Sequence, residues 1–260
     1  MLSLSICTIG LGTMLEGCHR TETVSEKQAD VENSEQQKQS SIKQNKKAQI
    51  QQQRNQNKFE NQLRNKLANL PYKQGSPIVI QINQNHSNLN INEWKQSNIV
   101  YGSLDRMGKI NHLTTAFLDH DNYIANPTIK SEIKTIVGYH PNQNTDIAPI
   151  LSPNILNHIN RKGAYDSKIN QVTLNNQNSM VLTKDAQKQL NQYKEQLIKT
   201  LQQTNGRVII QFMPIYRGSD VMAKGLWMQA VGTDGLNFNI YIQNVQSNKQ
   251  YDYSTGLLKK

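Results

Sequence analysis

The chain contains 260 residues, carries a formal net charge of +10 and has only 6% aromatic residues. Its length allows one domain of ordinary size with a tail, or two small domains. The charge suits a polyanionic partner or an anionic cell surface, and it equally suits a basic, solvated surface. The sequence has no Walker loop, no Gly-x-Gly-x-x-Gly fingerprint, no Cys-based metal cluster and no Ser-His-Asp arrangement, so none of these chemistries is indicated.

The N-terminal residues 1–18 are typical of a signal peptide. Residues 2–15 are apolar but too few for a membrane-spanning helix. They end in Leu15-Glu-Gly-Cys18, which resembles a bacterial lipobox and predicts lipidation of Cys18. Glu16 is atypical there and no Lys or Arg precedes the run, so translation could start upstream. The alternative is a buried N-terminal segment with two ordinary cysteines.

Residues 19–70 are dominated by Gln, Asn, Lys, Glu and Ser. Such a composition buries too little apolar surface to offset its ordering entropy, so it predicts a disordered tether. The last part, 46–70, can instead form a polar helix, because Ile50, Phe59, Leu63, Leu67 and Leu70 are loosely spaced by three or four.

A folded domain is expected over residues 71–260. After Thr183 the apolar residues Ala186, Leu190, Tyr193, Leu197 and Leu201 recur at helical spacing. This pattern predicts an amphipathic helix of about five turns that covers a sheet.

The C-terminal part predicts that sheet. Alternating runs at 207–216, 221–231 and 236–244 are separated by Gly-containing turns, which is typical of an antiparallel three-stranded meander. One face of the meander is apolar, and the other carries Asn, Gln and Tyr. The fold class is therefore α+β with a mainly antiparallel central sheet.

Four segments of this region, 204–218, 223–231, 238–245 and 251–256, resemble in that order the strands of streptococcal DNA-entry nucleases and related secreted DNases. Ser103-Leu-Asp-Arg-Met-Gly-Lys-Ile110 resembles their opening turn. These proteins belong to the DNA/RNA non-specific endonucleases, whose core is the ββα-metal fold. The resemblance covers roughly residues 71–123 and 170–256.

The resemblance implies a catalytic motif Asp-Arg-Gly-His, in which the His is a general base and the Arg holds the scissile phosphate. No such motif occurs in this chain. Leu156-Asn-His-Ile159 is the nearest match, with His158 as the candidate base and Leu156 in place of the Arg. A second register through Tyr165-Asp166 puts Ile169 where the His belongs and implies a dead site. His120 and His140 are weaker candidates.

The resemblance also implies an Asn that binds one hydrated Mg²⁺. Asn178 lies within one residue of the expected position, with Asn175 and Asn176 as competitors. The basic residues Arg161, Lys162 and Lys168 follow His158 and are candidate phosphate contacts.

Two functions of different class follow. The first is an exported nuclease of a Gram-positive cell, lipid-anchored or secreted, which hydrolyses DNA or RNA with Mg²⁺. The second is an inactive pseudo-nuclease lipoprotein that binds nucleic acid or a protein partner at the cell surface. Losing a charge-stabilising Arg commonly costs on the order of 10²–10³ in rate and favours the second. Neither function calls for a small-molecule cofactor, and the oligomeric state is left open.

Overall fold

The computed structural model describes residues 46–48 and 50–259. The signal-like segment with Cys18, and residues 19–45 of the expected tether, lie outside the described residues. The chain divides into a unit of residues 1–56, whose described residues are helical and exposed, and a compact unit of residues 57–260. Within the described residues, no helix combines the length and apolar character needed to cross a membrane.

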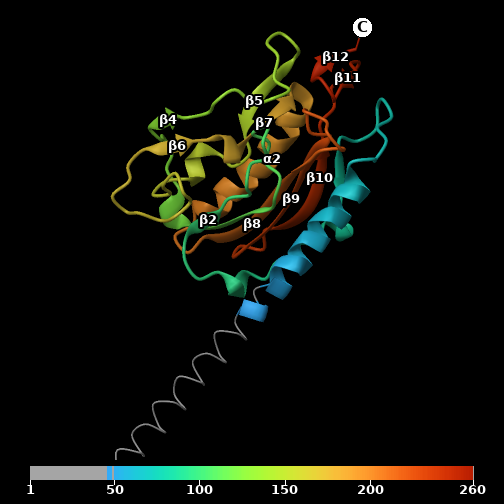
Figure 1. Cartoon of the computed structure of the whole chain (residues 1–260). Coiled ribbons are helices and arrows are strands. Elements are labelled where there is room, and N and C mark those ends of the chain that lie inside the picture. The colour runs from blue at the N-terminus through green and yellow to red at the C-terminus, as the bar shows by residue number, and fades with distance from the viewer. Residues whose placement is uncertain (1–45, 49, 260) are drawn as a thin grey trace, which may run out of the picture. The chain divides into compact units, whose positions relative to one another are not determined.

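A six-stranded antiparallel sheet forms the centre of the compact unit (Figure 1). The strand order is β1-β10-β9-β8-β3-β2. The predicted three-stranded meander is confirmed, and it consists of the neighbouring strands β8, β9 and β10. The strands are β1 (Val79–Gln81), β2 (Asn98–Val100), β3 (Thr114–Asp119), β8 (Arg207–Ile215), β9 (Gly225–Gly232) and β10 (Asn237–Gln243).

The predicted amphipathic helix is α2 (Lys184–Leu201), and it covers the apolar face of the sheet. Thr183 caps its N-terminus by accepting a hydrogen bond from the backbone N–H of Ala186. Leu190 and Leu197 are fully buried in the core that also contains Phe238 of β10. Burial of each such side chain stabilises the fold by about 1.5–3 kcal/mol.

Short strands and single-turn helices make up the segments between the main elements. β5 (Thr145–Pro149) pairs antiparallel with β7 (Ser179–Thr183), and β4 (Ile129–Ser131) pairs in parallel with β6 (Val172–Leu174). Single-turn 3-10 helices are η1 (Asn83–Asn85), η2 (Ile91–Glu93), η3 (His120–Asn122), η4 (Pro153–Ile155) and η5 (Asn176–Asn178). A final ribbon, β11 (Tyr251–Asp252) with β12 (Leu257–Leu258), lies near the C-terminus.

The Asn/Gln/Tyr face of the meander is also buried, although its residues are polar. Gln229 donates to Gln211, and Gln211 donates to Thr115 on β3. The indole N–H of Trp227 donates to the amide oxygen of Asn239 at 2.9 Å. Because these amides satisfy one another across neighbouring strands, the face can be covered without leaving polar groups unpaired.

Two segments cover this face: a helix that ends at residue 67 packs on its apolar residues, and residues 85–88 form hydrogen bonds with Gln229 and Asn239. Leu63, Leu67 and Ala68 are buried against a cluster that includes Met213 and Trp227. Helical packing therefore begins earlier than residue 71, where the sequence analysis places the start of the domain. The polar residues of the segment do not offset the entropic cost of ordering it. Burial of these few leucines does offset that cost.

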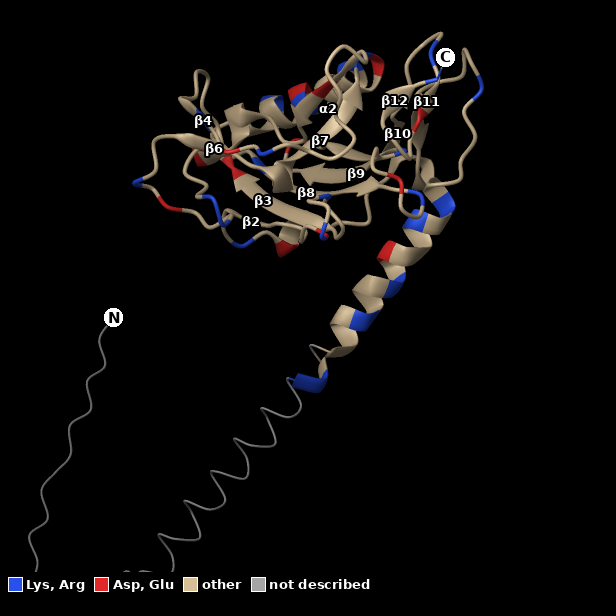
Figure 2. Ribbon diagram, turned by 45° about the horizontal axis from the view of Figure 1, so that its top comes forward, with Lys and Arg blue, Asp and Glu red and all other residues tan. Residues whose placement is uncertain are grey.

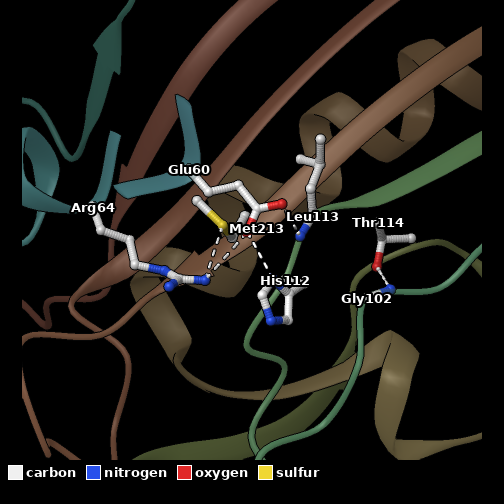
Figure 3. Close-up of polar contacts among 7 residues, drawn as sticks. All are labelled: Glu60, Arg64, Gly102, His112, Leu113, Thr114 and Met213. Atoms are coloured by element: carbon white, nitrogen blue, oxygen red, sulfur yellow. Dashed lines mark hydrogen bonds and ion pairs between the residues drawn. The ribbon is translucent and has the colours of Figure 1, made fainter. Parts of the chain in front are cut away.

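A buried carboxylate, that of Glu60, anchors this helix to the segment before β3 (Figure 3). Glu60 accepts a hydrogen bond from the backbone N–H of Leu113 and lies 2.9 Å from Nδ1 of His112. The Arg64 guanidinium lies 3.7 Å from the same carboxylate, and it also contacts the sulfur of Met213. These contacts fix the helix in one register on the sheet.

The packing of this helix can be tested by shortening one buried side chain. Leu67→Ala should lower the free energy of unfolding of the full chain by about 2–4 kcal/mol, because Leu67 is only 1% exposed. Ile50→Ala is the matched control; Ile50 is 46% exposed, so the change should stay within about 0.5 kcal/mol. Equal effects of the two variants in chemical denaturation would contradict the packing.

Candidate active site

The loop that carries His158 leaves the small sheet at the end of β5 and passes through η4. Ile155, Leu156 and Ile159 are all buried in the main core, so the loop is fastened on both sides of His158. The Ser152 side chain caps η4 by accepting from the backbone N–H of Asn154. The position of His158 is therefore determined by apolar packing of its neighbours.

The backbone at His158 has φ of 61°, a left-handed conformation that side-chain-bearing residues seldom adopt. Its carbonyl accepts a hydrogen bond from the backbone N–H of Asp166 at 2.7 Å, which closes a small hairpin. Gly163, at the tip, has φ of 90° and accepts from the N–H of Ile99 on β2. A Cβ at Gly163 would lie 1.9 Å from the Ile99 carbonyl oxygen, so only glycine allows this approach.

The imidazole of His158 is oriented by a backbone carbonyl. Its Nδ1 lies 2.8 Å from the carbonyl oxygen of Ile169. A carbonyl oxygen can only accept, so Nδ1 carries the proton in this contact. In the neutral ring, Nε2 then has the free lone pair that a general base needs.

The ring of Tyr165 packs edge-on against His158, with ring centroids 5.7 Å apart. Desolvation raises the pKa of the Tyr165 phenol, and the carboxylates of Asp121 and Asp119 raise it further. Tyr165 also lines a hollow of roughly 580 Å³, and so connects that hollow to His158. The other walls include Trp94, Asn98, Asp119, Asp121 and Lys162.

The three candidate phosphate contacts lie on the same loop as His158 but differ in their surroundings. Lys162 lines the hollow and is exposed. Lys168 is also exposed. The Nε of Arg161 lies 3.2 Å from the carboxylate of Glu132, which also pairs with Lys130 at 2.7 Å. Lys162 and Lys168 are therefore more available to an anion than Arg161 is.

Asn178 is buried and fully engaged with the backbone. Its side-chain oxygen accepts from the N–H of Leu151 at 2.8 Å, and its amide N–H donates to the Leu151 carbonyl at 3.1 Å. The side chain is 1% exposed, so in this arrangement it offers a cation no open oxygen. The competitors are engaged too: Asn175 accepts from Gln177, and Asn176 accepts from the backbone of Lys134.

No group of three or more His, Cys, Asp or Glu side chains that could hold a metal ion occurs in the part of the chain that the structure describes. Leu156, which stands where the resemblance puts an Arg, is 2% exposed and belongs to the core. The side chains around His158 therefore do not fit a Mg²⁺ site without rearrangement.

The weaker histidine candidates lie elsewhere. Nδ1 of His120 contacts the carbonyl oxygen of Leu201 at 3.0 Å, and Nε2 of His140 contacts that of Thr255 at 2.8 Å. Two partners of His158 do not follow from the sequence. The Ile169 carbonyl belongs to the backbone and has no residue-type signal, and Tyr165, seven residues after His158 in a turn-rich segment, belongs in the sequence to the competing register.

No family model and no curated protein matches the sequence. Among solved structures, the chain is similar to NucA from Streptococcus agalactiae with magnesium ion bound, at 23% identity and a TM-score of 0.56. That match covers 78% of this chain and 96% of NucA. The metal-free form of NucA matches at 23% identity with a TM-score of 0.57, over 77% of this chain and 95% of NucA. The compact unit therefore has the fold of NucA.

The buried lysine that contacts the end of β5, Lys194, predicts that the free energy of unfolding depends on pH. Lys194 of α2 is buried and donates to the carbonyl of Pro149, the last residue of β5, and burial lowers its pKa to about 8. Above pH 8 the folded chain binds fewer protons here than the unfolded chain, whose Lys194 has the ordinary value of 10.5. The free energy of unfolding should therefore rise by about 2 kcal/mol between pH 8 and pH 10.

Chemical denaturation across this range should show the rise in the native chain and in Lys199→Met, an exposed lysine on the same helix. Lys194→Met should remove most of it, and the part that remains comes from Lys224, whose pKa burial also lowers. The range stops at pH 10 because burial raises the pKa of Tyr101 from 10.0 to about 12, which makes stability fall at higher pH. An unchanged slope in Lys194→Met would contradict the assignment.

Proposed function

We propose that this chain is an exported, cell-surface endonuclease-like protein that binds nucleic acid and hydrolyses its phosphodiester bonds. The observation that carries the proposal is the hydrogen bond from His158 Nδ1 to the Ile169 carbonyl, which leaves Nε2 free as a base. The NucA fold and the nuclease-like order of the C-terminal segments support the same function. Whether the substrate is DNA or RNA is left to experiment.

In the proposed reaction, Nε2 of His158 takes a proton from a water molecule as that water attacks the phosphorus. The bond from phosphorus to one sugar oxygen breaks, and that oxygen leaves and is protonated by solvent water. General-base assistance of this kind contributes about 10²–10⁴ in rate. Lys162 and Lys168 contact the phosphate chain, and Arg161 joins them if its pair with Glu132 opens. The net charge of +10 favours approach of a polyanion.

A divalent metal is part of the family expectation, and NucA has been solved with magnesium bound. In this chain Asn178 is committed to Leu151, so no step is assigned to a metal. Removal of divalent ions with EDTA tests the expectation directly. Loss of cleavage would mean that Asn178, or another oxygen donor, is released when substrate binds.

The second candidate, an inactive nucleic-acid-binding protein, is favoured by one specific observation. In the register through His158, Leu156 stands where the resemblance expects the phosphate-holding Arg, and its side chain is buried in the core, so no small rearrangement supplies a charge there. Such a protein would retain the basic loop and the hollow lined by Lys162. We keep export through residues 1–18 and lipid attachment at Cys18 as part of both proposals.

The deciding experiment incubates the full chain with plasmid and single-stranded DNA in the presence of Mg²⁺ or Mn²⁺. Cleavage should occur, and His158→Ala should slow it by about 10²–10⁴. His140→Ala is the matched control, because His140 contacts a carbonyl far along the chain at Thr255, and it should leave the rate unchanged.

Absence of cleavage in all preparations, combined with DNA binding that weakens steeply with salt, would establish the inactive binder. Absence of both cleavage and salt-sensitive binding would overturn both candidates. Cleavage that survives His158→Ala would remove His158 from the mechanism.

A further inference from the structure

A second hollow, of about 290 Å³, lies beside the ribbon β11–β12. It shares no lining residue with the hollow beside Tyr165. In Figures 1 and 2 the ribbon lies close to the C-terminus, at the end of the compact unit away from β4 and β6. Figure 2 shows Lys and Arg colouring on the surrounding loops.

The charges that line this hollow are unbalanced. The lining includes one carboxylate, that of Asp252, and four cationic side chains: Arg217, Lys224, Lys249 and Lys259. The Asp252 carboxylate already accepts from the N–H and the hydroxyl of Ser254, at 3.0 and 2.7 Å. Within the described residues, none of the three lysines has a carboxylate at ion-pair distance.

Lys224 is the most constrained of these cations. It precedes β9, is half-buried, and its Nζ lies 3.7 Å from the centre of the Tyr253 ring. Burial lowers the pKa of Lys224, and the charges of Arg217 and Lys259 lower it further, against an opposing effect of Asp220. Asp220 itself lies 3.2 Å from Arg217 and does not reach Lys224 as an ion-pair partner.

Cations held together in a partly desolvated hollow repel one another, which raises the free energy of the folded chain. An anion bound between them removes this repulsion. The hydroxyls of Tyr251 and Tyr253 do not supply this negative charge, because each already donates a hydrogen bond. Tyr251 donates to the Gln143 carbonyl, and Tyr253 donates to the Asn244 carbonyl. Their rings instead form apolar walls. Arg and Lys side chains converging on such a space match the several acceptor oxygens of a phosphate.

We propose that the hollow lined by Arg217, Lys224, Lys249 and Lys259 binds a phosphate group. Its volume is at the lower end of the range for ligand pockets, about 300–1,000 Å³, and suits a compact anion better than a stretch of duplex. The phosphate can belong to a small phosphomonoester or to the end of a nucleic-acid strand. The proposal does not depend on catalysis at His158.

Isothermal titration calorimetry of the full chain with inorganic phosphate provides the first test, and we expect a Kd of about 1 mM or tighter. Lys224→Met should weaken binding about tenfold or more, as loss of one charge-assisted contact does. The double variant Lys249→Gln/Lys259→Gln changes only exposed side chains, so it tests the same site without risk to folding. Lys199→Gln, an exposed lysine of α2, should bind like the native chain.

Two short oligonucleotides, one with and one without a 5′-phosphate, distinguish a small phosphomonoester from the end of a nucleic-acid strand. Both are titrated into the His158→Ala variant, in which hydrolysis is expected to be slow. Binding that requires the 5′-phosphate and matches inorganic phosphate supports recognition of the phosphate alone. Tighter binding of the phosphorylated oligonucleotide, lost in the double variant, supports a nucleic-acid end. Absence of phosphate binding, or binding unchanged in Lys224→Met and in the double variant, would overturn the proposal whatever the nuclease assay shows.

Discussion

Burial of both faces of one antiparallel sheet is the constraint on which the rest of this structure depends. The apolar face is covered by α2, and the polar face is covered by the helix that ends at residue 67 together with residues 85–88. On the polar face, burial is possible only because side chains such as Gln229 and Asn239 bond to neighbours across the strands. With both faces occupied, functional side chains are left to the loops and to the rims of the sheet.

The His158 loop lies at such a rim and is held in place by its neighbours. Buried neighbours fix its ends, and Gly163 lets it contact the edge strand β2 at backbone distance. The left-handed backbone at His158 is retained because the surrounding hydrogen bonds hold it. The same tight packing places Leu156 and Asn178 inside the protein, where neither can easily meet a phosphate or a cation. The orientation of the His158 imidazole and the closure of the expected metal position thus have one physical origin.

The sequence predicted the meander and α2 because their apolar residues repeat with clear periods of two and of three to four. It did not predict β4, β5, β6 and β7, which are three to five residues long and lie in Asn-rich segments. His158 was selected as a candidate from the nearest match to a motif that the chain lacks, and its hydrogen-bond partner is the Ile169 carbonyl, which no residue type reveals. The basic hollow escaped notice because residues 217 to 259 meet there only through the fold.

Nitrogen-15 NMR of the imidazole of His158 tests the central claim most directly. When the ring is neutral, its proton should reside on Nδ1, hydrogen-bonded to Ile169, and Nε2 should be unprotonated. Assignment would use the signal lost in His158→Ala. A ring whose proton resides on Nε2 would contradict the account, because that nitrogen could then not accept a proton from water.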